Sequence, residues 1–226
     1  IRHHPLEGKR QLQINVFNEI AQREFYGNKP IFLFDANDRS NSATKGFHDS
    51  AIRNWNLYPK FLKRLFRRAF GVGLHNPDER VKESEWIGAF SKLRDSLYYC
   101  KKCNIPNFYD FEDHKNGNHQ YCWRCQSVAD LPMRLEIGDR TLLCTHHMKV
   151  YAHHTHSRLN FDDEIARMSQ HPHDPSRWGI KNTGSVDWTL QTLDGKSVQV
   201  PVGRSVPLKH GLTIHFGSTE GRLLSK

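Results

Sequence analysis

The first half of the chain carries hydrophobic residues at helical spacing. After Pro59, apolar side chains recur at i, i+3, i+4 and i+8, and basic side chains fill the opposite face. The apolar positions are Phe61, Leu62, Leu65, Phe66, Ala69 and Phe70, and the basic positions are Lys60, Lys63, Arg64, Arg67 and Arg68. Pro begins a helix well and Gly ends one, so we expect an amphipathic helix between Pro59 and Gly71. A second helix is predicted from Glu83 to about Leu97, with Trp86, Ile87, Phe90, Leu93 and Leu97 on one side.

From about Met133 the pattern changes to short runs of alternating residues. Residues 134–143 predict two strands around a Gly-Asp turn. Further strands are predicted at residues 178–182, 187–190, 197–200 and 212–217, divided by Gly-containing turns. Short strands with regular turns are typical of a small β-sandwich or barrel. The stretch from His153 to Arg177, rich in His, Asp and Pro, is expected to be a long loop.

These patterns predict an α+β, multi-domain chain. Residues 1–97 form a helical part, residues 98–128 a Cys-containing segment with few aliphatic residues, and residues 129–226 an all-β sandwich. The sequence begins at Ile1 without an initiator Met or a secretory pattern, so we expect that it starts inside a longer protein.

Composition narrows the class of protein. The chain has 226 residues, and its 5 Trp, 13 Phe and 7 Tyr argue against wholesale disorder. No apolar run approaches the roughly 20 residues that cross a bilayer, so no membrane is expected. The net charge of +9 favours acidic or phosphate-bearing partners, although a basic surface without a specific ligand stays open.

Four of the five cysteines form two C-x-x-C pairs, Cys100 with Cys103 and Cys122 with Cys125, separated by 18 residues. Tetrahedral zinc needs four converging ligands, and each tight bend delivers two thiolates. The sequence therefore predicts a Cys₄ zinc ribbon over residues 98–128, with a structural zinc that has no open coordination position. Two disulfides or free buried thiols are the alternative. Metal spacing also indicates a reducing compartment, hence the cytoplasm.

Cys144 is the fifth thiol, and histidines follow it at positions 146, 147, 153, 154 and 156. Together they could form a second metal site and an active centre. The run Leu142-Leu143-Cys144 indicates instead a strand with a core cysteine, and we expect the histidines to lie on the surface or in loops.

Short motifs in the helical part resemble a known family. Residues 76–86, with Asn76-Pro77, Arg80 and Glu85-Trp86, are similar to the turn between the last two helices of the protein kinase C-lobe. The segment His4–Gly8 resembles another C-lobe motif. Residues 32–41 resemble a signature of bacterial eukaryotic-like Ser/Thr kinases, with Ala36 in place of a Pro. The resemblance implies a buried ion pair for Arg80.

The motifs that hold ATP and Mg²⁺ are missing from the sequence, as are those that orient the substrate hydroxyl. We therefore expect no catalytic and no cofactor-binding residue, and no kinase activity from this chain alone. ATP and Mg²⁺ would belong only to the complete kinase.

The end of the chain resembles a second family. Residues 205–217 are similar to the last strands of a forkhead-associated domain, and residues 178–184 to its mid-domain strand and following loop. That family binds phosphothreonine peptides through an Arg and a Ser on neighbouring loops. Neither signature is clear here, so no binding residue is carried over, and phosphopeptide binding stays open.

The sequence thus predicts the C-terminal regulatory and docking part of a bacterial Ser/Thr kinase. By resemblance, its partner in stress-response signalling is a von Willebrand A-type protein or a PP2C-type phosphatase. A fragment of this kind should expose the apolar face that meets the rest of the C-lobe, and it should self-associate. The alternative is a basic zinc-ribbon protein that binds nucleic acid through residues 60–68 and Lys101, Lys102 and Arg124.

Overall fold

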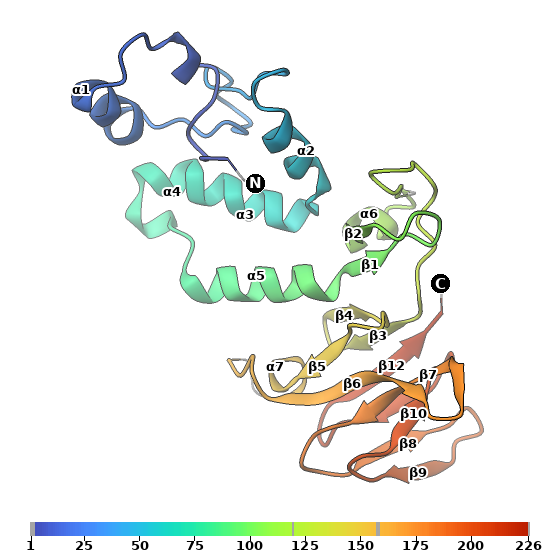
Figure 1. The fold of residues 1–226 in the computed structure, drawn as a ribbon. Helices are drawn as coiled ribbons and strands as arrows, with labels where there is room; N and C mark the ends of the chain where they lie inside the picture. The colour runs from blue at the N-terminus through green and yellow to red at the C-terminus, as the bar shows by residue number, and fades with distance from the viewer. Residues whose placement is uncertain (1–2, 119, 157–158, 226) are drawn as a thin grey trace. The chain divides into compact units, whose positions relative to one another are not determined.

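The computed structural model describes residues 3–118, 120–156 and 159–225 (Figure 1). The chain divides into two compact units, Ile1–Leu93 with Asp110–Asn118, and Arg94–Tyr109 with His119–Lys226. The segment that contains the cysteine pairs is therefore shared, because its short middle helix belongs to the first unit. The three-part division expected from the sequence stays a prediction.

The first unit is helical. In chain order it contains η1 (Gln11–Gln13), α1 (Glu19–Gln22), the π-helix η2 (Arg23–Asn28), α2 (Asp49–Leu57), α3 (Lys60–Phe70), α4 (Val72–His75), η3 (Pro77–Glu79), α5 (Glu83–Asp95) and α6 (Phe111–Lys115). The last two residues of α5 lie in the second unit. Helix α3 begins directly after Pro59, as predicted, and the second predicted helix ends at Asp95, two residues early.

The core of the first unit is aromatic. Phe32, Leu33, Ala51 and Trp55 are buried together, and Phe66 and Phe70 of α3 pack against them. Helix α5 contributes less than its pattern predicts, because Ile87 and Phe90 are half exposed. Within α5, only Ser91 is buried.

Polar side chains fix the backbone of residues 32–41. The Asp35 carboxylate accepts from the backbone N–H groups of residues 37 and 38. The fully buried Asn41 side chain donates to the carbonyl oxygens of Leu6 and Ile31, at 2.6 and 2.7 Å. Buried polar groups are retained when they are hydrogen-bonded in this way. Asn41 therefore fixes the N-terminal segment against the apolar run that follows Pro30.

The second unit begins with a two-stranded antiparallel sheet, β1 (Leu97–Tyr99) and β2 (Pro106–Phe108), and continues as a β-sandwich. One sheet has the strand order β4-β3-β12-β11-β8-β9, and the other has the order β10-β7-β6-β5. The strands are β3 (Arg134–Ile137), β4 (Arg140–Leu143), β5 (Lys149–Tyr151), β6 (Glu164–His171), β7 (Asp174–Asn182), β8 (Trp188–Gln191), β9 (Ser197–Val200), β10 (Ser205–Pro207), β11 (Thr213–His215) and β12 (Glu220–Leu224), and the short helix α7 (Ala152–Thr155) follows β5. Residues from both sheets bury one apolar core, which includes Leu135, Met168, Ile180, Trp188 and Ile214. The predicted all-β region is thus an antiparallel sandwich and not a barrel.

The expected loop from His153 to Arg177 is wrong. It contains β6 and the first part of β7, which form a long hairpin. The alternation is present: Ala166 and Met168 face the core, whereas Arg167 and Ser169 do not. The many polar residues of the outer face and the prolines near the turn hide this pattern in the sequence. Among the described residues, no helix is long and apolar enough to cross a membrane.

Candidate metal centre

The four predicted cysteines lie together in the second unit. Their sulfur atoms are all within 4.8 Å of one another. The distance between the Sγ atoms of Cys100 and Cys125 is 3.5 Å, and that between Cys103 and Cys122 is 3.6 Å. A tetrahedral ion with Zn–S bonds of about 2.3 Å needs sulfurs about 3.8 Å apart. These separations fit a metal ion and are far longer than the roughly 2.05 Å of a disulfide.

Two matching turns position the sulfurs. In each, the residue after the second cysteine has a left-handed backbone, with φ of 53° at Asn104 and 57° at Gln126. The N–H of that residue donates to the carbonyl of the first cysteine, at 2.7 Å for Cys100 and 2.9 Å for Cys122. Asn tolerates this conformation better than most residues, so Asn104 is a local signal of the turn. The repetition makes each C-x-x-C pair a rigid bidentate arm.

Two residues around the sulfurs were not predicted. The Ser127 hydroxyl lies 3.3 Å from the Cys100 sulfur and 3.1 Å from the Cys125 sulfur. The Asn107 side chain accepts from the Trp123 N–H and donates to the Ile105 carbonyl, and its amide nitrogen lies 3.7 Å from the Cys122 sulfur. Such outer groups orient metal ligands. No spacing rule connects them to the cysteines in the sequence.

Hydrogen bonds around the sulfurs also change the pKa values of the thiols in a way that favours cation binding. The Ser127 hydroxyl and the backbone N–H of Cys103 lower the pKa of Cys100 to about 6, and Ser127 lowers the pKa of Cys125 as well. Burial raises the pKa of Cys103 to about 12. Because thiolates are the metal-binding form, the site favours loss of protons when a divalent ion enters. Four protein ligands would fill a tetrahedral shell, which suits a structural ion.

Cys144 lies outside this cluster, in the core of the sandwich. It is buried, and burial raises the pKa of its thiol to about 12. A protonated, buried thiol is a packing residue and not a nucleophile.

The expectation of surface histidines is wrong for two of them. His153 and His154 are buried in α7. His154 Nε2 lies 3.0 Å from the Asp95 carboxylate, and its Nδ1 accepts from the Tyr151 N–H at 2.8 Å. With Asp95, these histidines place three ligand atoms close enough for an ion.

The hydrogen bonds of His154 nevertheless oppose metal binding. Because Nδ1 accepts a backbone N–H, the proton of the neutral ring is on Nε2, and Nε2 then donates to Asp95. Neither nitrogen has a lone pair free for an ion. The arrangement is a buried His–Asp pair that fixes α7 against Asp95 within the second unit.

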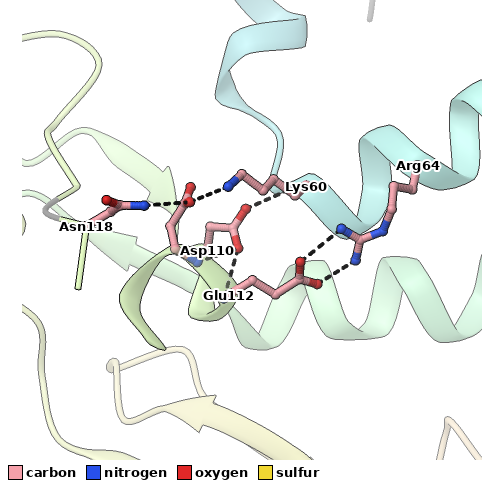
Figure 2. A network of polar contacts seen from close by, with 6 residues as sticks. Lys60, Arg64, Asp110, Glu112 and Asn118 are labelled. Carbon is pink, nitrogen blue, oxygen red and sulfur yellow. Dashed lines mark hydrogen bonds and ion pairs between the residues drawn. The ribbon is translucent and has the colours of Figure 1, made fainter. Parts of the chain in front are cut away.

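Three of the five cations of the predicted basic helix α3 pair with carboxylates of the first unit. Figure 2 shows Lys60 and Arg64 reaching the carboxylates of α6. Lys60 Nζ lies 2.5 Å from Asp113, and the two terminal nitrogens of Arg64 donate to Glu112 at 2.9 and 2.5 Å. Arg68 pairs with Glu85 of α5.

The remaining cations of α3 are also engaged or partly buried. The Arg67 guanidinium lies over the Trp55 ring, 5.5 Å from its centroid. Burial lowers the pKa of Lys63. The face that the nucleic-acid alternative requires is therefore mostly occupied by the chain's own carboxylates and rings.

Asp110 joins the two helices directly (Figure 2). One carboxylate oxygen accepts from the backbone N–H groups of Glu112 and Asp113, at 3.0 and 3.4 Å, as the N-cap of α6. The other accepts from the backbone N–H of Lys60, the first residue of α3, at 2.6 Å. One buried side chain thus caps its own helix and also the N-terminus of a helix that begins 50 residues before it in the sequence.

Comparison with known proteins assigns the chain to no family. No protein-family model matches the chain, and no curated protein matches it. Among solved structures, the chain is similar to the crystal structure of the MEK1 FHA domain in complex with a HOP1 phosphothreonine peptide. That match has 17% sequence identity and a TM-score of 0.30, and it covers 42% of this chain and 97% of the other. The kinase resemblance accordingly rests on the short sequence motifs alone.

Proposed function

We propose that this chain is a zinc-stabilised protein-docking module, the C-terminal regulatory part of a cytoplasmic bacterial Ser/Thr kinase. The observation that carries the docking role is the internal pairing of α3 with α5 and α6. A helix that binds nucleic acid needs cations available for phosphates. Here Lys60, Arg64 and Arg68 are already paired with carboxylates, which weakens the support for nucleic-acid binding.

The ribbon has a surface suited to protein. Tyr121, Trp123 and Val128 are exposed by 55%, 37% and 56% on the second cysteine turn and its flanks. Tyr121 and Val128 are paired across that turn. Exposed aromatic side chains held on a rigid turn are typical of docking surfaces. Of the nearby cations that the nucleic-acid alternative invokes, Lys101 is paired with Asp130.

The first unit also exposes apolar side chains. Val16, Ile20 and Phe47 are 69%, 80% and 71% exposed. A contact with the rest of a kinase C-lobe, or with a second copy, would cover them. The kinase origin and the von Willebrand A-type or PP2C-type partner come from the sequence resemblance.

Binding measured at two salt concentrations tests the proposal. We expect immobilised chain to bind a PP2C-type phosphatase or a von Willebrand A-type protein with weak salt dependence. Trp123→Ala should weaken that binding, and Val186→Ala, at a more exposed apolar site between β7 and β8, should not. A nucleic-acid protein would instead bind an oligonucleotide with a salt slope of about −0.9 per neutralised phosphate. That result, without binding of either protein, would refute the proposal.

A further inference from the structure

In the described part of the chain, the sandwich has four edge strands, and β9 differs from the other three. The six-stranded sheet ends at β4 and β9, and the four-stranded sheet ends at β5 and β10 (Figure 1). An open strand edge can pair with another chain, so proteins commonly blunt such edges with charges, prolines or bulges. Here β4 begins at Arg140, β5 begins at Lys149 and shifts register after Val150, and β10 ends at Pro207. β9 contains only Ser, Val and Gln, in regular register with β8.

The backbone of β9 directs hydrogen-bonding groups outward. In an antiparallel pair, opposite residues alternate between those that exchange two hydrogen bonds and those that exchange none. The β8–β9 register extends to Thr192 and Lys196, where the Thr192 N–H donates to the Lys196 carbonyl at 2.9 Å. Val198 therefore bonds to β8, whereas the N–H and C=O groups of Ser197 and Gln199 point away from the sheet. Among the described residues, no backbone group of another segment bonds to them.

An apolar side chain lies uncovered along the same edge. Val198 is 49% exposed, although Leu190, directly opposite it on β8, is only 8% exposed. Directly opposite residues share one face of a sheet, so Val198 lies on the core side at the rim of the sandwich. A further strand beside β9 would cover Val198 with the side chain that stands opposite it.

A hollow of about 470 Å³ opens on this side of the six-stranded sheet. The buried residues Leu190 and Leu212 line it, together with Pro207 and the exposed Leu193. A Cβ at Gly211 would lie 2.5 Å from Leu193 Cδ2, so the Leu193 side chain packs directly on that glycine. The hollow is therefore mainly apolar and accommodates a large apolar side chain.

Cations surround this edge. Arg204 follows β9 at the end of a turn, Lys209 lines the hollow, and both are exposed. Neither forms an ion pair with any residue that the structure describes, whereas Lys196, just before β9, pairs with Asp194 at 2.9 Å. Available cations favour a partner that carries acidic residues beside its apolar ones. They disfavour a second copy of this chain, because its net charge is +9.

We propose that β9 binds an extended segment of a partner protein, which joins the six-stranded sheet as a further strand. The segment has alternating apolar residues, one against Val198 and a larger one in the hollow, and acidic residues at its ends. Ser197 and Gln199 supply the main-chain hydrogen bonds. In strand addition these bonds give affinity, and pockets for alternate side chains give specificity. The inference rests on the proposed docking function and names the form in which the partner binds.

An NMR titration of the full zinc-loaded chain tests this edge. The probes are short peptides with alternating Val and Leu residues between acidic ends, the same peptides with Lys ends, and the same peptides with a central Pro. We expect the acidic-ended peptides to shift the amides of Ser197 and Gln199 and to slow their exchange with solvent, because both N–H groups then donate. Lys ends should weaken binding, and a central Pro should weaken it further, because Pro cannot donate to a strand ladder.

Variants at matched positions sharpen the test. Ser197→Pro removes one outward donor at the first residue of an edge strand, a position that tolerates proline. It should weaken peptide binding by about tenfold. Ser205→Pro makes the same change at the first residue of β10, where the N–H also points outward, and it should leave binding unchanged. Val198→Lys places a charge where the apolar side chain of the partner would pack, so it should also weaken binding.

The outcomes separate this edge from the docking function as a whole. If Ser197→Pro and Val198→Lys leave peptide binding unchanged, or the shifts fall on other residues, β9 is not the site. If the β9 amides shift with the concentration of the chain alone, a second copy occupies the edge, and the proposal is overturned. If no peptide binds but a protein partner still binds through Trp123, the edge proposal fails and docking stands. If neither peptides nor protein partners bind, the docking function itself fails.

Discussion

Removing the shared cap at Asp110 should loosen two helices at once. Asp110 is only 7% exposed and accepts three backbone N–H groups, one from α3 and two from α6. Loss of an N-cap costs about 1 kcal/mol per helix, so Asp110→Ala should cost about 2 kcal/mol for the pair. Leaving these N–H groups without an acceptor can raise the total to about 4 kcal/mol. The surrounding ion pairs compensate little, because they are solvent-exposed.

Native-state hydrogen exchange resolves this effect better than a global melt. The chain has two compact units, so a single unfolding free energy would mix their stabilities. A loss of 2 kcal/mol corresponds to exchange about 30-fold faster for amides that open with these helices. We expect this acceleration in both α3 and α6. Asp110→Asn keeps one acceptor oxygen, so it should lose the cap of one helix and about half of the free energy.

A single-helix cap provides the control. The Asn18 side chain accepts from the Ala21 N–H at 3.0 Å and caps α1 alone. Asn18→Ala should accelerate exchange in α1 and leave α3 and α6 unchanged. If Asp110→Ala affects only α6, the 2.6 Å contact with Lys60 does not stabilise α3, and the reasoning about a shared cap is wrong.

Three further results are expected. Metal analysis should give one zinc per chain. Cys100→Ser, or chelation of the metal, should unfold the cysteine segment while the amides of the sandwich stay protected from hydrogen exchange. Zinc that stays bound after the substitution would contradict the assignment. Burial and the neighbouring His154 lower the pKa of His153 from 6.5 to about 3. Between pH 6.5 and about pH 3, the unfolded state therefore binds one more proton than the folded state. The free energy of unfolding of the second unit should decrease by about 1.4 kcal/mol per pH unit as the pH falls below 6.5. Against wild type in metal-free buffer, His153→Gln should reduce that slope, and an unchanged slope would refute the assignment. Cys144, with its raised pKa, should resist iodoacetamide at pH 8 until denaturant is added, as mass spectrometry can show.

Local patterns predicted the parts of this fold that depend on neighbours in sequence. Helix α3 followed from the period of its apolar residues and from Pro59, and β9 matched its predicted range of residues 197–200. The cysteine turns were found because two ligands in one bend leave a fixed spacing. In each case the determining contacts lie within about four residues.

The features that were missed depend on distant partners. Burial of His154 depends on Asp95, 59 residues away, whose carboxylate accepts a hydrogen bond from the ring Nε2. Asp110 caps α6 through neighbouring residues, and its second role depends on Lys60. Ser127 lies beside the sulfur of Cys100 only after two turns have come together. A sequence without aligned relatives gives no signal for such pairs.

The distribution of charge also depends on residues distant in the sequence, and it bears on the function. The sequence concentrates its most obvious basic run on α3, and the structure cancels much of it with carboxylates from α5 and α6. The cations that remain available include Arg177 and Lys181, which the sequence separates by three residues and the sheet places on one face. Net charge therefore indicates an acidic partner only together with the positions of the unpaired groups. Neutralising Arg177 and Lys181 should therefore reduce binding of acidic peptides more than neutralising any two cations of α3.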